Sequence, residues 1–153
     1  MNHYSIYWIK EEFARFFYYR SDILCRFIKS YHRQQNREDL EKQFQYITMD
    51  MPANLLISHI LKNQSSNVRI ENKEEFLVID EGTRNISLHI EQKRINFRGD
   101  IIHDAESLLF PALRSYQPYF FVVGELEFDF GWVSPVLQLK GTDKARQVLY
   151  SYL

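Results

Sequence analysis

The hydrophobic positions in the first part of the chain change from a strand-like pattern to a helical one. Residues 4–9 (YSIYWI) place β-branched and aromatic side chains on both alternating faces, which predicts a strand buried on both sides, inside a sheet. From residue 10 to residue 62 the apolar side chains recur at helical spacing, and the last run, 53–61, follows Pro52, which suits the first turn of a helix. Four helices are therefore expected. The predicted core stripes of the first three are Phe13, Phe16 and Phe17, then Ile23, Phe27 and Tyr31, and then Leu40, Phe44 and Ile47.

The rest of the chain alternates over shorter intervals. Its predicted strands are 68–70, 76–79, 86–90, 95–97, 119–123 and 127–130, and residues 100–116 return to helical spacing, although Pro111 should kink or break that helix. A block of helices followed by hairpins favours an α/β protein of the α+β arrangement, with a central mixed β-sheet and flanking helices. We expect a single domain over residues 1–140 and a C-terminal helix or tail over residues 141–153.

Composition and charge narrow the class of protein. A chain of 153 residues with 45% hydrophobic side chains can bury one core, which excludes an intrinsically disordered protein. Its 19 Lys and Arg against 20 Asp and Glu leave a net charge of −1, so direct nucleic-acid binding is not expected. The apolar runs are too short for a membrane helix, the opening residues do not resemble a signal peptide, and the single Cys25 cannot form an internal disulfide. We therefore expect a cytoplasmic protein without a membrane partner.

The sequence lacks the motifs of common catalytic and cofactor sites. It contains no Gly-rich phosphate loop, G-x-S-x-G, H-E-x-x-H or C-x-x-C, so we expect no catalytic residue, cofactor or metal. One alternative stays open: His89 and Glu91, on one side of a predicted strand, together with His103 could serve an uncharacterised cytoplasmic small-molecule enzyme or sensor. A metal at His89 and Glu91 would need a further ligand, and the simpler interpretation is an exposed polar strand face.

Aromatic residues are unusually frequent, at 16% of the chain. One short helix cannot easily bury all the rings of residues 13–19, and Tyr18 and Tyr19 are predicted to point away from its core stripe. In a later helix Tyr46 lies roughly 120° from the centre of the core stripe, with Gln43 on the flank. An exposed tyrosine beside an amide group suits a recognition surface, although rings that simply cover the sheet are an alternative.

Three sequence blocks resemble one known family. Residues 4–14 (YSIYWIKEEFA), 42–48 (KQFQYIT) and 130–136 (FGWVSPV) are similar to the sporulation inhibitor of replication protein family, SirA, of endospore-forming Bacillus relatives. The blocks occur in the family's order and at comparable separations, whereas residues 63–92 match only in general character. The family's fold resembles the central mixed sheet with flanking helices that the pattern predicts.

The resemblance implies a small, non-enzymatic inhibitor that is made at the commitment to sporulation. Such a protein binds the N-terminal domain of the replication initiator DnaA and stops initiation at the origin. The family's contact surface lies on its early helices, and its motif positions correspond to Phe13, Phe17, Gln43 and Tyr46. The family usually has Tyr where this chain has Phe17, so a hydrogen bond from that hydroxyl would be missing. Because the four positions belong to one contact surface in the family, we expect the two helices that carry them to lie side by side and form one patch.

A third interpretation concerns the same aromatic patch. Exposed apolar surfaces often mark contacts between copies of one chain. The patch could therefore close a weak homodimer, whose size in solution would depend on concentration.

Overall fold

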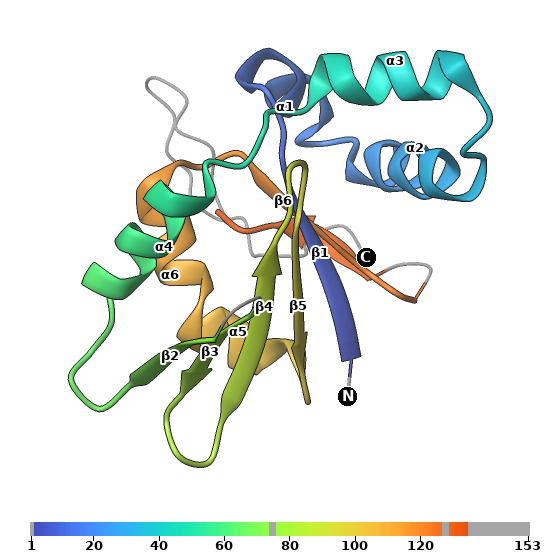
Figure 1. Cartoon of the computed structure of the whole chain (residues 1–153). Coiled ribbons are helices and arrows are strands. Elements are labelled where there is room, and N and C mark those ends of the chain that lie inside the picture. The colour runs from blue at the N-terminus through green and yellow to red at the C-terminus, as the bar shows by residue number, and fades with distance from the viewer. Residues whose placement is uncertain (1, 74–75, 127–128, 135–153) are drawn as a thin grey trace.

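The structure is a computed structural model that describes residues 2–73, 76–126 and 129–134. The predicted C-terminal helix or tail, 141–153, and part of the predicted strand 127–130 lie outside these residues. In chain order the elements are β1 (Asn2–Trp8), α1 (Glu11–Phe17), α2 (Ser21–Arg33), α3 (Glu38–Ile47), α4 (Ala53–Lys62), β2 (Arg69–Lys73), β3 (Phe76–Asp80), β4 (Asn85–Ile90), β5 (Ile95–Gly99), α5 (Ile102–Leu108), α6 (Phe110–Tyr116), β6 (Phe120–Gly124) and β7 (Phe130–Trp132) (Figure 1).

The described strands form one sheet in the order β2-β3-β4-β5-β1-β6-β7. This arrangement confirms the predicted α+β class and the single domain with helices flanking a central sheet. Every described strand pair is antiparallel, whereas we expected strands of both directions. The reason is that β2 to β5 form a meander of hairpins, and β1 runs antiparallel to both of its neighbours, β5 and β6.

Strand β1 lies inside the sheet, as its pattern of apolar residues predicts. Tyr4 and Ile6 belong to the hydrophobic cluster on one face, whereas Tyr7 and Ile9 belong to the cluster on the other. Successive side chains of a strand point to opposite faces, so a strand that is apolar on both must be covered on both. Strand β1 is therefore a central element of the fold.

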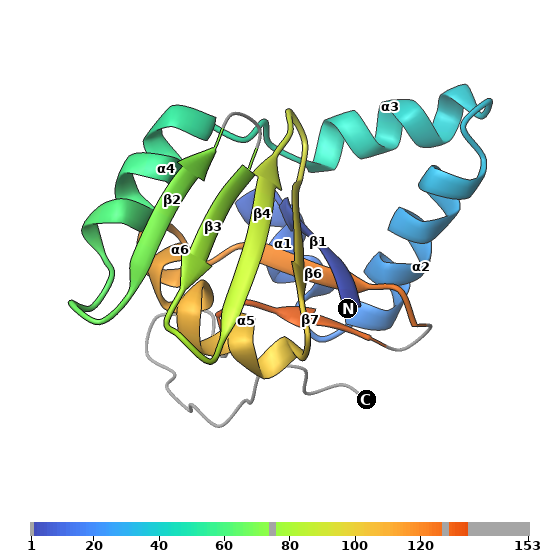
Figure 2. The same cartoon turned by 60° about the horizontal axis from the view of Figure 1, so that its bottom comes forward.

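One face of the sheet is covered by α4, α5 and α6, which lie behind β2 to β4 in Figure 2. The predicted break at Pro111 is confirmed. Helix α5 ends at Leu108 and α6 begins at Phe110, with the proline in its first turn, where no backbone N–H is needed.

The other face is covered only in part. Helices α1, α2 and α3 pack against residues of β1, β6 and β7, and their cluster includes no described residue of β2 to β5. The uncovered strands alternate accordingly: the side chains of β4 that point away from α4 to α6 are Asn85, Ser87 and His89. A polar sheet face therefore lies next to α2.

The predicted core stripe of α2 is displaced by one position. Leu24, Cys25 and Ile28 are the buried apolar residues, whereas Ile23 is exposed. Phe27 and Tyr31, which we placed in the sheet core, are only partly buried. Helix α2 contacts both the sheet and α3, so it has two apolar faces. The predicted stripe belongs to the face toward α3, whereas the sheet is contacted by the neighbouring face.

The predicted faces of α1 are also corrected by the structure. Phe16 is exposed, and Tyr18, which we expected to point outward, is buried with 2% of its surface exposed. Ala14 is the buried residue of this helix, because its small side chain lets the helix lie close to the sheet. Tyr18 comes directly after the last residue of α1, keeps helical backbone angles (φ −56°, ψ −40°) and lies four residues after Ala14, so it continues the same inward face.

Polar contacts fix both ends of α2 to the sheet. At its start the Trp132 Nε1–H donates to Ser21 Oγ over 2.9 Å, and the Ser21 hydroxyl donates to the Tyr18 carbonyl over 3.0 Å. At its other end the Tyr7 hydroxyl lies 2.7 Å from His32 Nε2. Because these contacts are buried or partly buried, they hold the helix in one orientation.

Burial around the Tyr7–His32 contact shifts the acidity of both groups. Desolvation raises the pKa of Tyr7, and it lowers the pKa of His32 from its ordinary 6.5, with the positive charge of Arg94 lowering it further and Glu91 opposing that effect. The neutral Tyr7 hydroxyl can thus donate to a neutral imidazole. Protonation of His32 removes this acceptor and places a cation beside Arg94.

We predict that stability decreases as the pH falls from about 7 towards 5. In that interval the unfolded chain binds a proton at His32 that the folded chain resists, so the folded state loses its advantage below pH 6.5, the ordinary pKa of the group. Replacing His32→Gln should flatten this part of the profile. Urea unfolding at several pH values measures it, and an equal slope in the variant would contradict the assignment to His32.

Candidate functional site

Helices α1, α2 and α3 enclose an apolar groove of about 570 Å³ at one end of the sheet. Aromatic rings form most of its surface, and single acidic and amide side chains lie at its edge. The lining residues are Glu12, Phe13, Phe16, Phe17, Phe27, Gln43, Tyr46 and Ile47. An apolar surface of this kind, outside the core, is a frequent mark of a binding site.

The structure brings all four residues of the predicted contact surface to this groove. Phe13 and Phe17 come from α1, and Gln43 and Tyr46 come from α3. The rings of Phe13 and Tyr46 meet edge to face across the two helices, with centroids 5.3 Å apart. The two helices therefore lie side by side; that these residues bind a partner stays a prediction.

Exposure separates the groove residues from the core residues of the same helix. Tyr46 is 63% exposed, whereas Phe44 is buried, as its stripe predicts; Ile47 is also buried, although one part of it reaches the lining of the groove. Gln43 is exposed, and its amide has no hydrogen-bond partner among the described residues. Helix α3 thus uses one side for folding and presents the other to solvent.

Two groove residues were not predicted as surface residues. Phe16 was assigned to the core but is 55% exposed, and its ring meets that of Phe17 at 4.9 Å. Phe27 enters the groove from α2 and is partly buried. The signal for Phe27 was present in the sequence, since α2 carries more apolar residues than one face can bury.

Cations lie over two rings of the groove region. Lys10 Nζ is 5.1 Å from the centre of the Tyr46 ring, and the Arg20 guanidinium is 4.6 Å from the centre of the Phe16 ring. Such contacts are worth about 0.5–1 kcal/mol at exposed sites, and they hold exposed rings in fixed orientations. The groove therefore has an apolar floor and a polar edge.

The end of α3 is attached to the end of β1 through main-chain hydrogen bonds. The Lys10 N–H donates to the Ile47 carbonyl over 2.9 Å, and the Met49 N–H donates to the Trp8 carbonyl over 2.8 Å. Because α1 begins at Glu11, these bonds place the first turn of α1 against the last turn of α3. The two helices that form the walls of the groove, α1 and α3, are consequently joined at one end.

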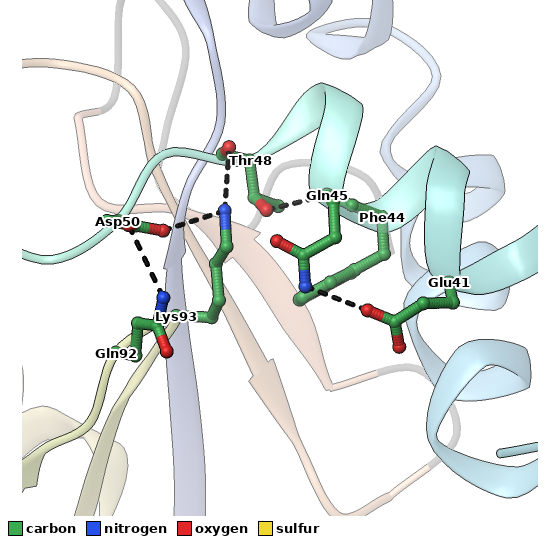
Figure 3. A network of polar contacts seen from close by, with 7 residues as sticks. All are labelled: Glu41, Phe44, Gln45, Thr48, Asp50, Gln92 and Lys93. Carbon is green, nitrogen blue, oxygen red and sulfur yellow. Dashed lines mark hydrogen bonds and ion pairs between the residues drawn. The ribbon is translucent and has the colours of Figure 1, made fainter.

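The hairpin between β4 and β5 supports the same end of α3 (Figure 3). Lys93 Nζ donates to the Thr48 carbonyl over 3.2 Å and lies 2.9 Å from Asp50, which also accepts a bond from Gln92 over 3.4 Å. The Thr48 hydroxyl donates to the Phe44 carbonyl over 2.6 Å and so satisfies a carbonyl at the helix end.

The start of α3 is fixed by a separate contact. Arg37 forms two bonds to the Asp39 carboxylate, of 2.9 and 2.6 Å, and this pairing lowers the pKa of Asp39 to about 2. Farther along, the Tyr31 ring stacks on Phe44 with centroids 4.0 Å apart, and its hydroxyl donates to Glu41. Helix α3 is thus held to the rest of the protein at its C-terminal end and along its buried side, whereas the exposed Arg37–Asp39 pair fixes only the first turn of the helix itself.

The three residues of the enzyme or sensor alternative do not converge. His89 points from β4 to the uncovered face of the sheet, where its ring lies 5.8 Å from that of Phe76. His103 belongs to α5 on the opposite face and lies 3.3 Å from Glu106, while Glu91 pairs with Arg94 at the β4–β5 turn. Within the described ranges no three His, Cys, Asp or Glu side chains could hold a metal ion together.

No helix in the described part of the chain is both long and apolar enough to cross a membrane.

The fold and the groove define a small α+β protein that presents an aromatic surface on its early helices. Residues 2–137 match the model of the family described as "Sporulation inhibitor of replication protein SirA". The chain belongs to this family, because the match spans nearly all of its length.

A relative from Bacillus subtilis (strain 168) is similar over most of both chains. It is the protein described as "Sporulation inhibitor of replication protein SirA", and it is 29% identical over 148 residues, covering 88% of this chain and 94% of the relative. The predicted family is thereby confirmed.

The different roles of Phe44 and Tyr46 predict different effects on stability. Phe44→Ala removes a ring that is 1% exposed and should lower the free energy of unfolding by about 3–5 kcal/mol. Tyr46→Ala removes an exposed ring and should cost less than about 1 kcal/mol. Urea unfolding of both variants measures the difference, and a comparable loss in Tyr46→Ala would place its ring in the core.

Proposed function

We propose that this protein inhibits the initiation of DNA replication during sporulation by binding the N-terminal domain of the initiator DnaA. The contact is made through the aromatic groove between α1 and α3. The observation that carries the proposal is that Phe13, Phe17, Gln43 and Tyr46, the positions implied by the family resemblance, line one exposed apolar groove. Family membership supports the inhibitory role.

The groove has the physical properties of a protein-binding surface. The half-buried Phe13 ring and the exposed Tyr46 ring pack together in it, and burying aromatic rings of this kind provides much of the binding energy at protein interfaces. The described contacts that fix α3 before binding reduce the entropy that must be lost when the partner arrives. The surface is therefore prepared for its partner.

Gln43 gives the contact its direction. Its exposed amide offers two donors and one acceptor at the edge of an otherwise apolar groove. Phe17 contributes apolar area, but it lacks the hydroxyl that the family usually has at this position. Binding in this protein therefore depends more on Phe13 and Tyr46 than on a hydrogen bond at residue 17.

Inhibition by this mechanism is steric and involves no chemical reaction. An occupied N-terminal domain is denied to self-association of the initiator and to its other regulators, so assembly at the origin is impaired. The protein acts in the cytoplasm as a binding protein, not as an enzyme, and needs no cofactor. Its net charge of −1 agrees with a role that does not require contact with DNA.

We predict that Tyr46→Ala or Phe13→Ala weakens binding to the isolated N-terminal domain of DnaA from the same organism. Each truncation should cost about 2–4 kcal/mol, or about thirtyfold to several hundredfold in affinity. Calorimetric titration measures the change. The matched control is Tyr19→Ala, because Tyr19 is 64% exposed and lies two residues after the end of α1 but does not line the groove.

Two outcomes would contradict the proposal. One is the absence of saturable binding when both proteins are folded at concentrations of tens of micromolar. The other is an equal loss of affinity in Tyr19→Ala and Tyr46→Ala, which would place the contact elsewhere.

Sedimentation of the protein alone tests the homodimer interpretation, since a dimer closed by the groove would dissociate in Tyr46→Ala.

A further inference from the structure

A second concave site lies on the other side of α2, away from the aromatic groove. It is a cleft of about 700 Å³ between α2 and the part of the sheet face that the early helices leave uncovered. This volume is within the usual range of small-molecule sites, about 300–1,000 Å³. Its floor is the sheet, and one wall is the helix.

Strand register explains why the floor is polar. Arg98 of β5 is directly opposite His3 of β1 on one side and Ser87 of β4 on the other. The next row on the same face pairs Asn96 with Ser5 and with His89. Central strands usually carry apolar side chains on a covered face, so these polar side chains indicate a surface in contact with water or a polar ligand.

Positive charge gathers on both the floor and the wall. Arg94 and Arg98 come from β5 and its preceding turn, and Lys29 and Arg33 come from consecutive turns of α2. Glu125 is the acidic residue in the lining, and it accepts a bond from the His3 main-chain N–H over 3.2 Å. The cleft is therefore cationic in a chain whose net charge is −1.

The described ion pairs leave much of this charge uncompensated. Arg94 is paired with Glu91, and Lys29 donates to the Leu126 carbonyl over 2.7 Å and interacts electrostatically with the Asp129 carboxylate. No carboxylate of the described residues forms an ion pair with Arg33 or Arg98. Like charges four residues apart on a helix, as Lys29 and Arg33 are, destabilise it slightly, and a bound anion would offset this repulsion.

We propose that this cleft binds an organic polyphosphate of nucleotide size. Guanidinium groups from two elements, Arg33 on the wall and Arg98 on the floor, suit the oxygens of a di- or triphosphate, which accept bidentate bonds. Ser87, directly opposite Arg98, and the exposed Phe76 ring beside His89 provide a hydroxyl and a ring face for the organic part. The sequence has no Gly-rich loop, so side-chain cations and not main-chain N–H groups hold the phosphates.

A small molecule fits the cleft better than a nucleic acid does. The cationic residues face one hollow that α2 closes on one side, whereas a duplex requires basic residues spread along an open surface. The cleft shares no lining residue with the aromatic groove, so a ligand there leaves the proposed contact surface for DnaA uncovered.

Calorimetric titration of the full chain with ATP, inorganic pyrophosphate and adenosine tests the proposal. ATP and pyrophosphate should bind saturably at one site, and adenosine should bind far more weakly. Arg98→Ala and Arg33→Ala should each lower the ATP affinity by about tenfold, the effect of losing one charge-assisted contact. Arg26→Ala is the matched control, because Arg26 is exposed on α2 but does not line the cleft.

Several results would overturn the proposal. No saturable binding of ATP or pyrophosphate at millimolar concentration would exclude the site. Equal affinity for adenosine and ATP would exclude recognition through phosphates, and an equal loss in Arg26→Ala would reduce the effect to general surface charge. Tighter binding of a short DNA duplex, weakened by the same two arginine substitutions, would assign the cleft to nucleic acid instead. Thermal melting of each variant verifies that it is folded, and binding of DnaA by Arg98→Ala should be unchanged.

Discussion

The main-chain junction between the end of β1 and the end of α3 determines where the early helices lie. The Lys10 N–H donates to the Ile47 carbonyl, and the Met49 N–H donates to the Trp8 carbonyl. Main-chain bonds of this kind fix the direction of both helices without depending on any one side chain. Because β1 is covered on both faces, its end is a rigid point of attachment. The aromatic groove follows from this geometry, since two helices that meet at one end of a strand leave a concave surface between them.

The limited reach of the early helices also explains the polar cleft. Three short helices can cover the β1, β6 and β7 part of the sheet, but they do not extend across β2 to β5. Strands that remain uncovered must alternate in polarity, and β5 does so, with Ile95 and Phe97 inside and Asn96 and Arg98 outside. The cationic cleft therefore arises at the boundary between the covered and the uncovered part of one sheet face.

Much of this fold could be predicted from residue patterns, and the failures have physical causes. The central position of β1 and the break at Pro111 follow from rules that act on single elements. The inward face of α2 does not, because a helix with two apolar faces has no unique stripe. Tyr18 was misplaced because the small Ala14, and not the three phenylalanines, marks the inward face of α1. Helical periodicity placed Tyr46 and Gln43 outside the core stripe of α3, and the family resemblance added Phe13 and Phe17. The excess of apolar residues in α2 indicated a second apolar face, but not that Phe27 would enter the groove.

Helix α2 separates the two surfaces and also explains how they can act independently. Phe27 faces the aromatic groove, and Lys29 and Arg33 face the cleft, so the helix contributes to both through different sides. Its start is bonded through Ser21 to Trp132, and its far end through His32 to Tyr7. A ligand in the cleft contacts the far anchor directly, because Tyr7 and His32 line the cleft, whereas the Ser21–Trp132 anchor lies outside it. The groove would change only if a displacement were transmitted along a helix that stays bonded at its start, so α2 favours weak coupling between the two surfaces.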